Sequence, residues 1–411
     1  MSSSKSSSES LPSPPDGHLQ AWIQVLCMHF VFFNSWGISN SFGVFQQFYS
    51  ETLPQSASDI SWIGGVQVSL LFFVGVIAGR ATDAGYFRLM FVLGVLLQLV
   101  GVFMTSLCRT YWQIFLAQAV CMGLGNGCTF CSGLSIMSSY FLRKRAFAVG
   151  LAASGAAVGG LVYPVVVDRL LYVNAIGYSW TLRVVGFIML ATQIPCIFLF
   201  KPRLPPRKAG SIVDWSAFKE LPFIFFTMSM FFNFWGLYFA FFYLGTFTRD
   251  IIGVSNSLNF IMVLNGVGII GRIIPSIIGD RVTGMLNIII PLSFSASLLV
   301  YCWAAVTTEV GLYAFAVVYG VLSAALQSLF PATATTMTPS IEKTGTRLGM
   351  ILSIVGVASL TGPSILGSLI QIDQGEYLYG QLFSATSILI GAISVVAARI
   401  AKTGFTWEGK V

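Results

Sequence analysis

Charged residues are scarce in this chain: they make up 9% of its 411 residues, whereas hydrophobic residues make up 55%. Typical soluble domains carry about 25% charged residues. Apolar stretches of roughly 17 to 25 residues recur from Leu19 to Ala401, and each is long enough to cross a hydrocarbon core of about 30 Å as a helix. This composition excludes a soluble globular protein and indicates an integral membrane protein.

A regular cysteine pattern is also absent. The seven cysteines lie in or beside apolar stretches at no fixed spacing, which argues against a disulfide framework. Cys128 and Cys131 form a CxxC pattern, but no second pair completes a metal site. We therefore expect thiols that pack as small apolar side chains, with no metal and no cofactor.

The apolar runs predict twelve transmembrane helices. Their predicted limits are 19–45, 61–79, 89–108, 112–137, 146–167, 180–200, 221–246, 257–279, 286–306, 310–333, 346–369 and 378–400. The segment 1–18 is rich in Ser and Pro and is predicted to be a disordered cytoplasmic tail. The first apolar run is too long for a cleaved signal peptide, so we expect it to remain in the mature protein.

Lys and Arg gather in alternate connections between these spans. Examples are "LRKR" at 142–145, "KPRLPPRK" at 201–208, and Lys343 with Arg347. By the positive-inside rule both termini and the central loop are cytoplasmic, and we expect the plasma membrane. The net charge of +7 is explained by loops that face anionic lipid, so no nucleic acid partner is expected.

A repeated motif divides the chain into two halves. "FFNSWG" at 32–37 and "FFNFWG" at 231–236 are 199 positions apart (231 − 32), and Pro164 matches Pro363 at the same offset. The sequence predicts an all-α integral membrane protein of twelve transmembrane helices in two pseudo-symmetric six-helix bundles, with the substrate site between them. The predicted parts are a bundle at 19–200, a cytoplasmic linker at 201–220, a bundle at 221–401 and a cytoplasmic tail at 402–411.

Two segments carry a family resemblance: "YFLRKRAFAVGLAASGAAVGG" at 140–160 and "GRATDAGYFR" at 79–88. From Asp16 to Lys402 the chain resembles the fungal branch of the monocarboxylate porter family, within the major facilitator superfamily. The resemblance implies the major facilitator fold and transport of a small-molecule organic acid across the lipid bilayer by alternating access. "DGHLQAW" departs from the family pattern, because His18 stands where another Gly is usual.

The resemblance breaks at the positions that bind substrate in animal carriers of lactate and pyruvate. Alignment with their motifs puts Asn40 at a Lys position, Gly268 at an Asp position and Arg272 at an Arg position. A charge inside the bilayer costs at least about 2.5 kcal/mol and by default marks a functional site. We favour a substrate or gating role for Arg272 over the alternative of a structural strut.

Carboxylates are missing from the membrane interior. None of the fifteen Asp and Glu residues falls in the middle of a predicted span, so the usual carboxylate relay of proton-coupled transporters has no candidate. His29, in the first span, is the remaining proton-coupling candidate, although a lone His on an apolar helix is more often packed and hydrogen-bonded. A substrate that carries its own proton is the other way in which protons could move.

Helical geometry assigns faces to the first span. Trp36 and Asn40 share one face, which we expect to line the cavity, whereas Asn34 lies about 120° away. Asn34 and its repeat mate Asn233 are predicted to bind neighbouring helices. The predicted substrate-binding residues are Arg272, Asn40, Trp36, Gln67, Asn126, Trp235, Tyr238, Phe242, Asn265 and Gln327. Aromatic walls, one Arg and several amides suit a lipophilic organic acid.

Charged turns at the ends of the second and eighth spans suggest gates. Asp83 with Arg88, and Asp280 with Arg281, are predicted to latch one end of the cavity, the alternative being solvated loop charges of little energetic value. Gly155 and Gly159 form a GxxxG motif, which we interpret as close helix packing rather than ligand binding.

The sequence thus predicts a secondary active or facilitative transporter of a monocarboxylate or a lipophilic acidic secondary metabolite, functional as a monomer. Proton linkage and the choice between export and uptake stay open. The alternative is a transporter-like nutrient sensor that binds an organic acid and signals without bulk flux. An enzyme is not expected, because the chain has no HExxH motif and "GLGNG" at 123–127 lies within a predicted helix.

Overall fold

The computed structural model describes residues 17–142, 144–174, 176–203, 205, 213–254, 257–338 and 341–405. Most of the predicted tail 1–18, much of the predicted linker 201–220 and residues 406–411 of the predicted C-terminal tail lie outside this range. The first half of the chain contains α1 (Leu19–Asn40), α2 (Phe42–Thr52), α3 (Ala57–Ala81), η1 (Thr82–Tyr86), α4 (Phe87–Thr105), α5 (Tyr111–Ile114), η2 (Phe115–Met122), α6 (Gly123–Ser139), α7 (Arg145–Asp168), η3 (Arg169–Val173) and α8 (Tyr178–Leu199). The second contains η4 (Trp215–Lys219), α9 (Leu221–Phe247), η5 (Thr248–Ile252), α10 (Leu258–Ile278), η6 (Gly279–Thr283), α11 (Met285–Trp303), α12 (Glu309–Thr336), α13 (Ile341–Ile372) and α14 (Leu378–Thr403).

Within the described residues, 11 continuous helical segments are long and apolar enough to span a membrane. The longest, Ala57–Thr105, has 49 residues and would extend about 73 Å if straight, more than twice a hydrocarbon core of about 30 Å. It turns back at η1, where Gly85 has a φ of 98°, a conformation that favours glycine. The segment therefore forms two spans, α3 and α4, which confirms the predicted total of twelve.

The helices agree with the predicted spans to within a few residues at most of their ends. The first span is the main exception: after a break at Ser41 it continues as α2 to Thr52. Gln46, Gln47 and Glu51 make α2 too polar for a hydropathy criterion to detect. The predicted linker also contains a short helix, η4, directly before α9.

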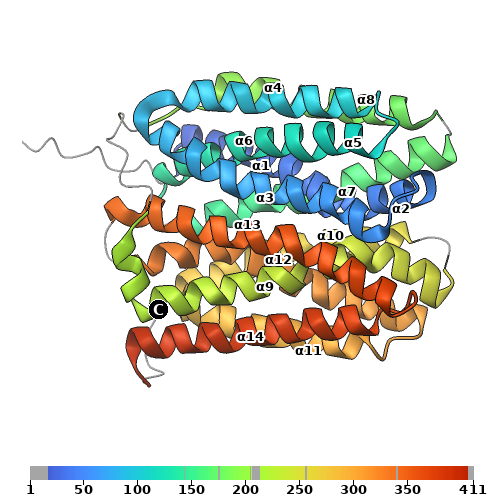
Figure 1. Cartoon of the computed structure of the whole chain (residues 1–411). Coiled ribbons are helices and arrows are strands. Elements are labelled where there is room, and N and C mark those ends of the chain that lie inside the picture. The colour runs from blue at the N-terminus through green and yellow to red at the C-terminus, as the bar shows by residue number, and fades with distance from the viewer. Residues whose placement is uncertain are drawn as a thin grey trace, which may run out of the picture.

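The two halves use the same helix pairs. In the first half, α1 packs on α7, α3 packs on α6 and α4 packs on α8. The corresponding pairs of the second half are α9 with α13, α10 with α12 and α11 with α14. Figure 1 shows the first half, in blue and green, stacked on the second, in yellow to red. The contacts between the halves run mainly along two symmetry-related pairs, α3 with α13 and α7 with α10.

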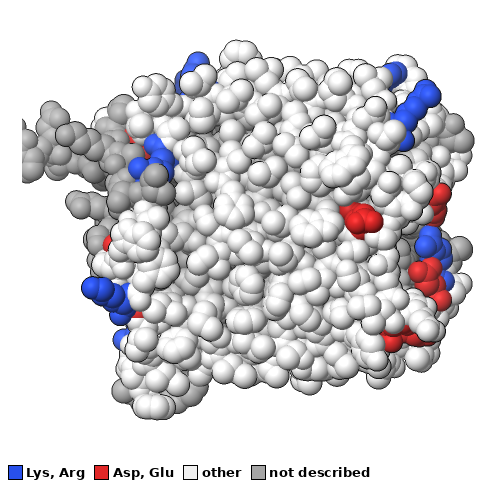
Figure 2. Space-filling model, viewed as in Figure 1, with Lys and Arg blue, Asp and Glu red and all other residues white. Residues whose placement is uncertain are grey.

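The two ends of the molecule differ from its middle. Charged side chains gather at both ends, and the broad band between them is uncharged on the face shown in Figure 2, as expected for a surface in contact with lipid. The start of α1, the start of α9 and the end of α14 lie at one end (Figure 1). We call this end the N/C face and the other end the opposite face.

The GxxxG motif lets α7 approach α1 closely. A Cβ atom on Gly155 would lie 2.1 Å from the carbonyl oxygen of His29, and one on Gly159 would lie 2.3 Å from that of Phe33. Both distances are far inside van der Waals contact. The interpretation of this motif as close helix packing is confirmed.

We expect Gly155→Ala to destabilise the protein by about 1–3 kcal/mol, because its methyl group has no room against the backbone of α1. The melting temperature should fall by about 3 °C or more. Gly79→Ala is the matched control: Gly79 is also helical, and nothing lies within 4 Å of its Cβ position. Equal melting temperatures for the two variants would contradict this account of the motif.

Candidate functional site

A cavity lies between the two halves, nearer to the N/C face than to the opposite face. The space between atoms in this region amounts to about 530 Å³, open solvent included. It is lined by Phe32, Trp36, Phe72, Phe130, Leu134, Val149, Ala153, Ala156, Phe234, Arg272, Gln327, Ser328, Phe330, Pro331, Leu348 and Leu352. α1, α3, α6 and α7 of the first half and α9, α10, α12 and α13 of the second supply these residues.

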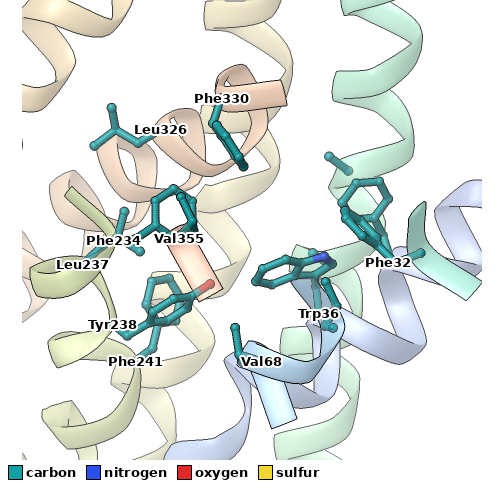
Figure 3. Close-up of a cluster of buried hydrophobic side chains, with 14 of the residues drawn as sticks. Phe32, Trp36, Val68, Phe234, Leu237, Tyr238, Phe241, Leu326, Phe330 and Val355 are labelled. Atoms are coloured by element: carbon teal, nitrogen blue, oxygen red, sulfur yellow. The ribbon is translucent and has the colours of Figure 1, made fainter. Parts of the chain in front are cut away.

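Aromatic rings from both halves form the walls of the cavity. The ring of Trp36 lies 5.4 Å from that of Phe72 and 5.7 Å from that of Phe130, measured between centroids. Across the interface, Phe234 packs on Phe72 at 6.3 Å. Figure 3 shows the indole of Trp36 and the hydroxyl of Tyr238 facing one another from the two halves. These walls suit a flat, lipophilic ligand.

Arg272 places a positive charge in this apolar surrounding. Its side chain is 2% exposed, and Nη2 donates to Oε1 of Gln327 at 3.1 Å. The contact between Nη1 and the carbonyl oxygen of Gly268 is long, at 3.5 Å. Among the described residues no carboxylate forms an ion pair with Arg272. A buried guanidinium held by neutral partners is suited to bind an anion.

The opposite face is closed by hydroxyl groups that cross between the halves. Ser61 of α3 and Tyr243 of α9 share a hydrogen bond of 2.5 Å, and the hydroxyl of Ser58 donates to the carbonyl oxygen of Ser364 on α13 at 2.9 Å. Further out, Arg249 pairs with Glu51 at 2.9 Å, but both side chains are exposed, so this pair contributes about 0–1 kcal/mol. The buried hydrogen bond between Ser61 and Tyr243 therefore contributes more to the closure than this exposed ion pair does.

Three of the predicted binding residues line the cavity: Trp36, Arg272 and Gln327. Asn40, Gln67 and Asn126 are fully buried in the first half. Each lies about one helical turn from the cavity wall, in the direction of the opposite face. Oδ1 of Asn126 accepts a hydrogen bond from Nε2 of Gln98 on α4 at 2.8 Å, within the first half.

The remaining predicted binding residues lie around the cavity at different depths. Tyr238 is buried beside Phe234, and Asn265 packs against Gly160 where α7 meets α10. Phe242 packs on Phe42 at 4.9 Å in the closure of the opposite face.

Trp235 is placed away from the cavity, contrary to expectation. Its indole N–H donates to Oγ1 of Thr361 at 3.0 Å, and its ring packs on Phe383 of α14 at 4.8 Å. The helix is rotated so that the preceding residue, Phe234, lines the cavity instead.

The two copies of the repeated motif have different partners. Asn34 donates to Oγ1 of Thr192 on α8 and accepts from the hydroxyl of Tyr163 on α7, which confirms the predicted role between helices. Asn233 donates to Ser229 of its own helix. The expectation that Asn233 binds a neighbouring helix was therefore wrong. On α14 its side chain packs against Gly391, which has no side chain to accept or donate a hydrogen bond.

His29 and the predicted gate residues lie outside the cavity lining. Nδ1 of His29 lies 3.3 Å from the carbonyl oxygen of Leu151 and 3.4 Å from Oγ of Ser154, both on α7. At the N/C face, a carboxylate oxygen of Asp83 lies 3.8 Å from the Cβ position of Gly345 on α13. Thus η1 of the first half reaches the start of α13 in the second.

The other gate residues are in the corresponding turns. Arg88 and Arg281 are exposed, and Asp280 is half-buried.

Arg347 was wrongly interpreted as a loop charge facing lipid headgroups. Its side chain is fully buried. It forms two hydrogen bonds of 2.6 Å with the carboxylate of Glu220 and one of 3.0 Å with Asp214. The three residues attach the end of the linker to α13. Their sequence separation of more than 120 positions left no local signal of the pairing.

A model of the Major Facilitator Superfamily matches residues 25–363. The chain belongs to the major facilitator superfamily. Members of this superfamily are membrane transporters, so the chain is a transporter and not an enzyme.

Fungal members of the superfamily resemble the whole chain. An MFS-type transporter of Gibberella zeae is 41% identical, over 94% of this chain and 88% of its own. The aspyridones efflux protein of Emericella nidulans is 33% identical over 96% and 80%, and the agnestins efflux protein of Paecilomyces divaricatus is 33% identical over 98% and 93%.

A solved structure shares the major facilitator fold. It is a bacterial homolog of the human lysosomal transporter Spinster, in an inward-facing and unoccupied conformation, with a TM-score of 0.65 over 95% of this chain and 98% of its own. The sequence identity is 16%, so the likeness concerns the fold alone.

We expect Tyr243→Phe to loosen the closure of the opposite face. The variant loses the buried hydrogen bond between the halves, which contributes about 1 kcal/mol. The fraction of molecules that are open at the opposite face should then rise about fivefold. Amide hydrogen exchange in Phe42–Thr52 should then accelerate by a similar factor. Tyr319→Phe is the control, because its hydroxyl donates to Leu237 within the second half, at 2.8 Å. Equal exchange in both variants would show that the Tyr243 hydroxyl does not hold the closure.

Proposed function

We propose that this superfamily member exports a lipophilic organic acid that carries one negative charge. The observation behind the proposal is the single guanidinium of Arg272, buried without a carboxylate partner among the described residues, in a cavity with aromatic walls. The cation would hold the acidic group and the rings would hold the apolar body of the substrate. A monocarboxylate meets both requirements, and so does an acidic secondary metabolite.

Export is favoured over uptake by the relatives. Two of the relatives are named as efflux proteins. The cavity lies on the side of the N/C face, and the opposite face is closed. The excess of Lys and Arg in the loops of the N/C face supports a cytoplasmic position for that face, with the protein in the plasma membrane. A cytoplasmic substrate would then enter the cavity in the conformation described here.

The cavity lies between the two halves of the chain, and we propose that the chain transports as a monomer. The passage between them also supports alternating access, in which the halves rock about the site. In that motion Asp83 and Arg88, with Asp280 and Arg281, are the proposed gates at the N/C face.

Substituting Arg272 should remove transport of an acid. We expect Arg272→Ala to lower carrier-mediated flux of 2-naphthoate into proteoliposomes at least about tenfold, since a hydrogen bond to a charged group contributes roughly 1.5–3 kcal/mol. Protein-free liposomes measure the passive leak. Arg272→Lys keeps the charge without the planar fork and should retain part of the flux. Unchanged flux in Arg272→Ala would refute the role of this residue.

Proton linkage through His29 is not favoured, because its ring faces α7 rather than the cavity. We expect His29→Gln to leave the ratio of 2-naphthoate flux with and without a pH gradient unchanged, since glutamine can still hydrogen-bond to α7. A pH-gradient effect that is present in the wild-type protein and lost in His29→Gln would instead assign proton coupling to this residue.

A further inference from the structure

Among the side chains of the first half that carry buried polar atoms without a hydrogen bond to the described residues, four lie next to the cavity wall or belong to it. Their unpaired atoms are Nδ2 and Oδ1 of Asn40, Nε2 and Oε1 of Gln67, Nδ2 of Asn126 and Nε1 of Trp36. All four side chains are at most 5% exposed. We call Asn40, Gln67 and Asn126 the amide cluster.

Helix register brings the amide cluster to one level of the molecule. The ring of Trp36 contacts those of Phe72 on α3 and Phe130 on α6. Asn40 lies four residues beyond Trp36 on α1, Asn126 four residues before Phe130 and Gln67 five residues before Phe72. α3 and α6 run antiparallel to α1, so all three steps lead toward the opposite face.

A close contact between α3 and α6 supports this placement. The Cβ position of Gly123 lies 3.2 Å from the Cα atom of Gln67, and Asn126 follows Gly123 by three residues, which is almost one turn. Gln67 and Asn126 therefore lie at nearby levels of the two helices; Oδ1 of Asn126 accepts a hydrogen bond from Nε2 of Gln98 on α4 at 2.8 Å, and its Nδ2 stays without a partner among the described residues.

Aromatic layers enclose the cluster on both sides. Trp36, with Phe72 and Phe130, separates it from the cavity. On the other side, Phe242 packs on Phe42 at 4.9 Å and lies 2.7 Å from the Cβ position of Gly64, one turn before Gln67. Phe242 belongs to the second half of the chain. Separation of the halves at the opposite face would consequently withdraw this layer and open the cluster to that side.

Buried polar atoms without partners destabilise a protein, and their concentration at one level of the passage needs a functional reason. The cluster with Trp36 holds four nitrogen donors and two oxygen acceptors that are unpaired. This excess of donors, without a formal charge, fits a ligand group that accepts hydrogen bonds, such as a ketone, lactam or ester carbonyl.

We propose that the amide cluster and the Trp36 indole form a carbonyl-binding subsite for the transported molecule, on the path from the cavity to the opposite face. The inference rests on the proposed function and names the substrate class more closely: an aromatic acid that also carries a carbonyl group. Arg272 holds the acidic end, and the amide cluster selects the carbonyl end before release.

Matched ligands test the subsite. In nanodiscs, with empty discs as the blank, titration calorimetry should find that 6-acetyl-2-naphthoate binds the wild-type protein about tenfold more tightly than 6-isopropyl-2-naphthoate, which has the same shape and no carbonyl. In Asn40→Leu and in Gln67→Met the acetyl preference should fall below about threefold, because each variant removes unpaired donors.

Stability of the ligand-free protein gives a second, independent measurement. Asn40→Leu and Gln67→Met should raise the melting temperature, because they remove buried polar atoms without partners. Gln24→Leu is the control: Gln24 is equally buried in the first half, but it bonds to Gln20, Leu199 and Lys201. This variant should lower the melting temperature and keep the acetyl preference.

The outcomes separate the two proposals. Equal affinity of the wild-type protein for both compounds, with binding that depends on Arg272, would overturn the subsite and leave the proposed function standing. A lower melting temperature in both cluster variants would also overturn the subsite, since it would mean that the amides stabilise the fold. Failure of both compounds to bind the wild-type protein would count against the proposed function and therefore against the subsite as well.

Discussion

A lipid bilayer offers no water to a polar group, and the structure depends on this constraint throughout. Helices satisfy their own backbone groups, and many hydroxyls bond to a carbonyl one turn earlier, as Ser35 does to Val31 and Thr227 to Phe223. A polar side chain without such a partner is costly. Several atoms of the amide cluster are exceptions of this kind, and Arg272 carries a buried charge that is held by neutral partners.

The same constraint shapes the packing of the helices. Lipid gives helices no hydrophobic reason to associate, so close approach has to supply the contact energy. Small residues permit it within each half: the Cβ position of Gly37 lies 2.6 Å from the Cα atom of Gly159. Between the halves, the Cβ position of Gly150 lies 2.8 Å from the carbonyl oxygen of Arg272. The interface that must open and close during transport is therefore tightly packed, with buried hydroxyl pairs across its closed end.

Sequence reasoning was most successful where the signal was local. The twelve spans follow from hydropathy, and the approach of α7 to α1 follows from a GxxxG spacing, because both depend on neighbouring residues in one helix. The repeated motif shows where this reasoning ends. Asn34 meets hydroxyls of Tyr163 and Thr192, whereas Asn233 in the second copy meets Gly391. The Asn shared by two nearly identical local patterns acquired different roles because the neighbouring helices differ.

By itself, the sequence determined the membrane location, the number of spans, the twofold repeat and the isolated charge of Arg272, since each is a property of residue types in order along the chain. The tertiary structure decided which faces of the helices meet. It placed Phe234 rather than Trp235 in the cavity, paired Arg347 with the linker and brought Ser61 to Tyr243. These contacts join residues far apart in the chain, and they depend on helix rotation and on the docking of the two halves, for which hydrophobic periodicity carries no information.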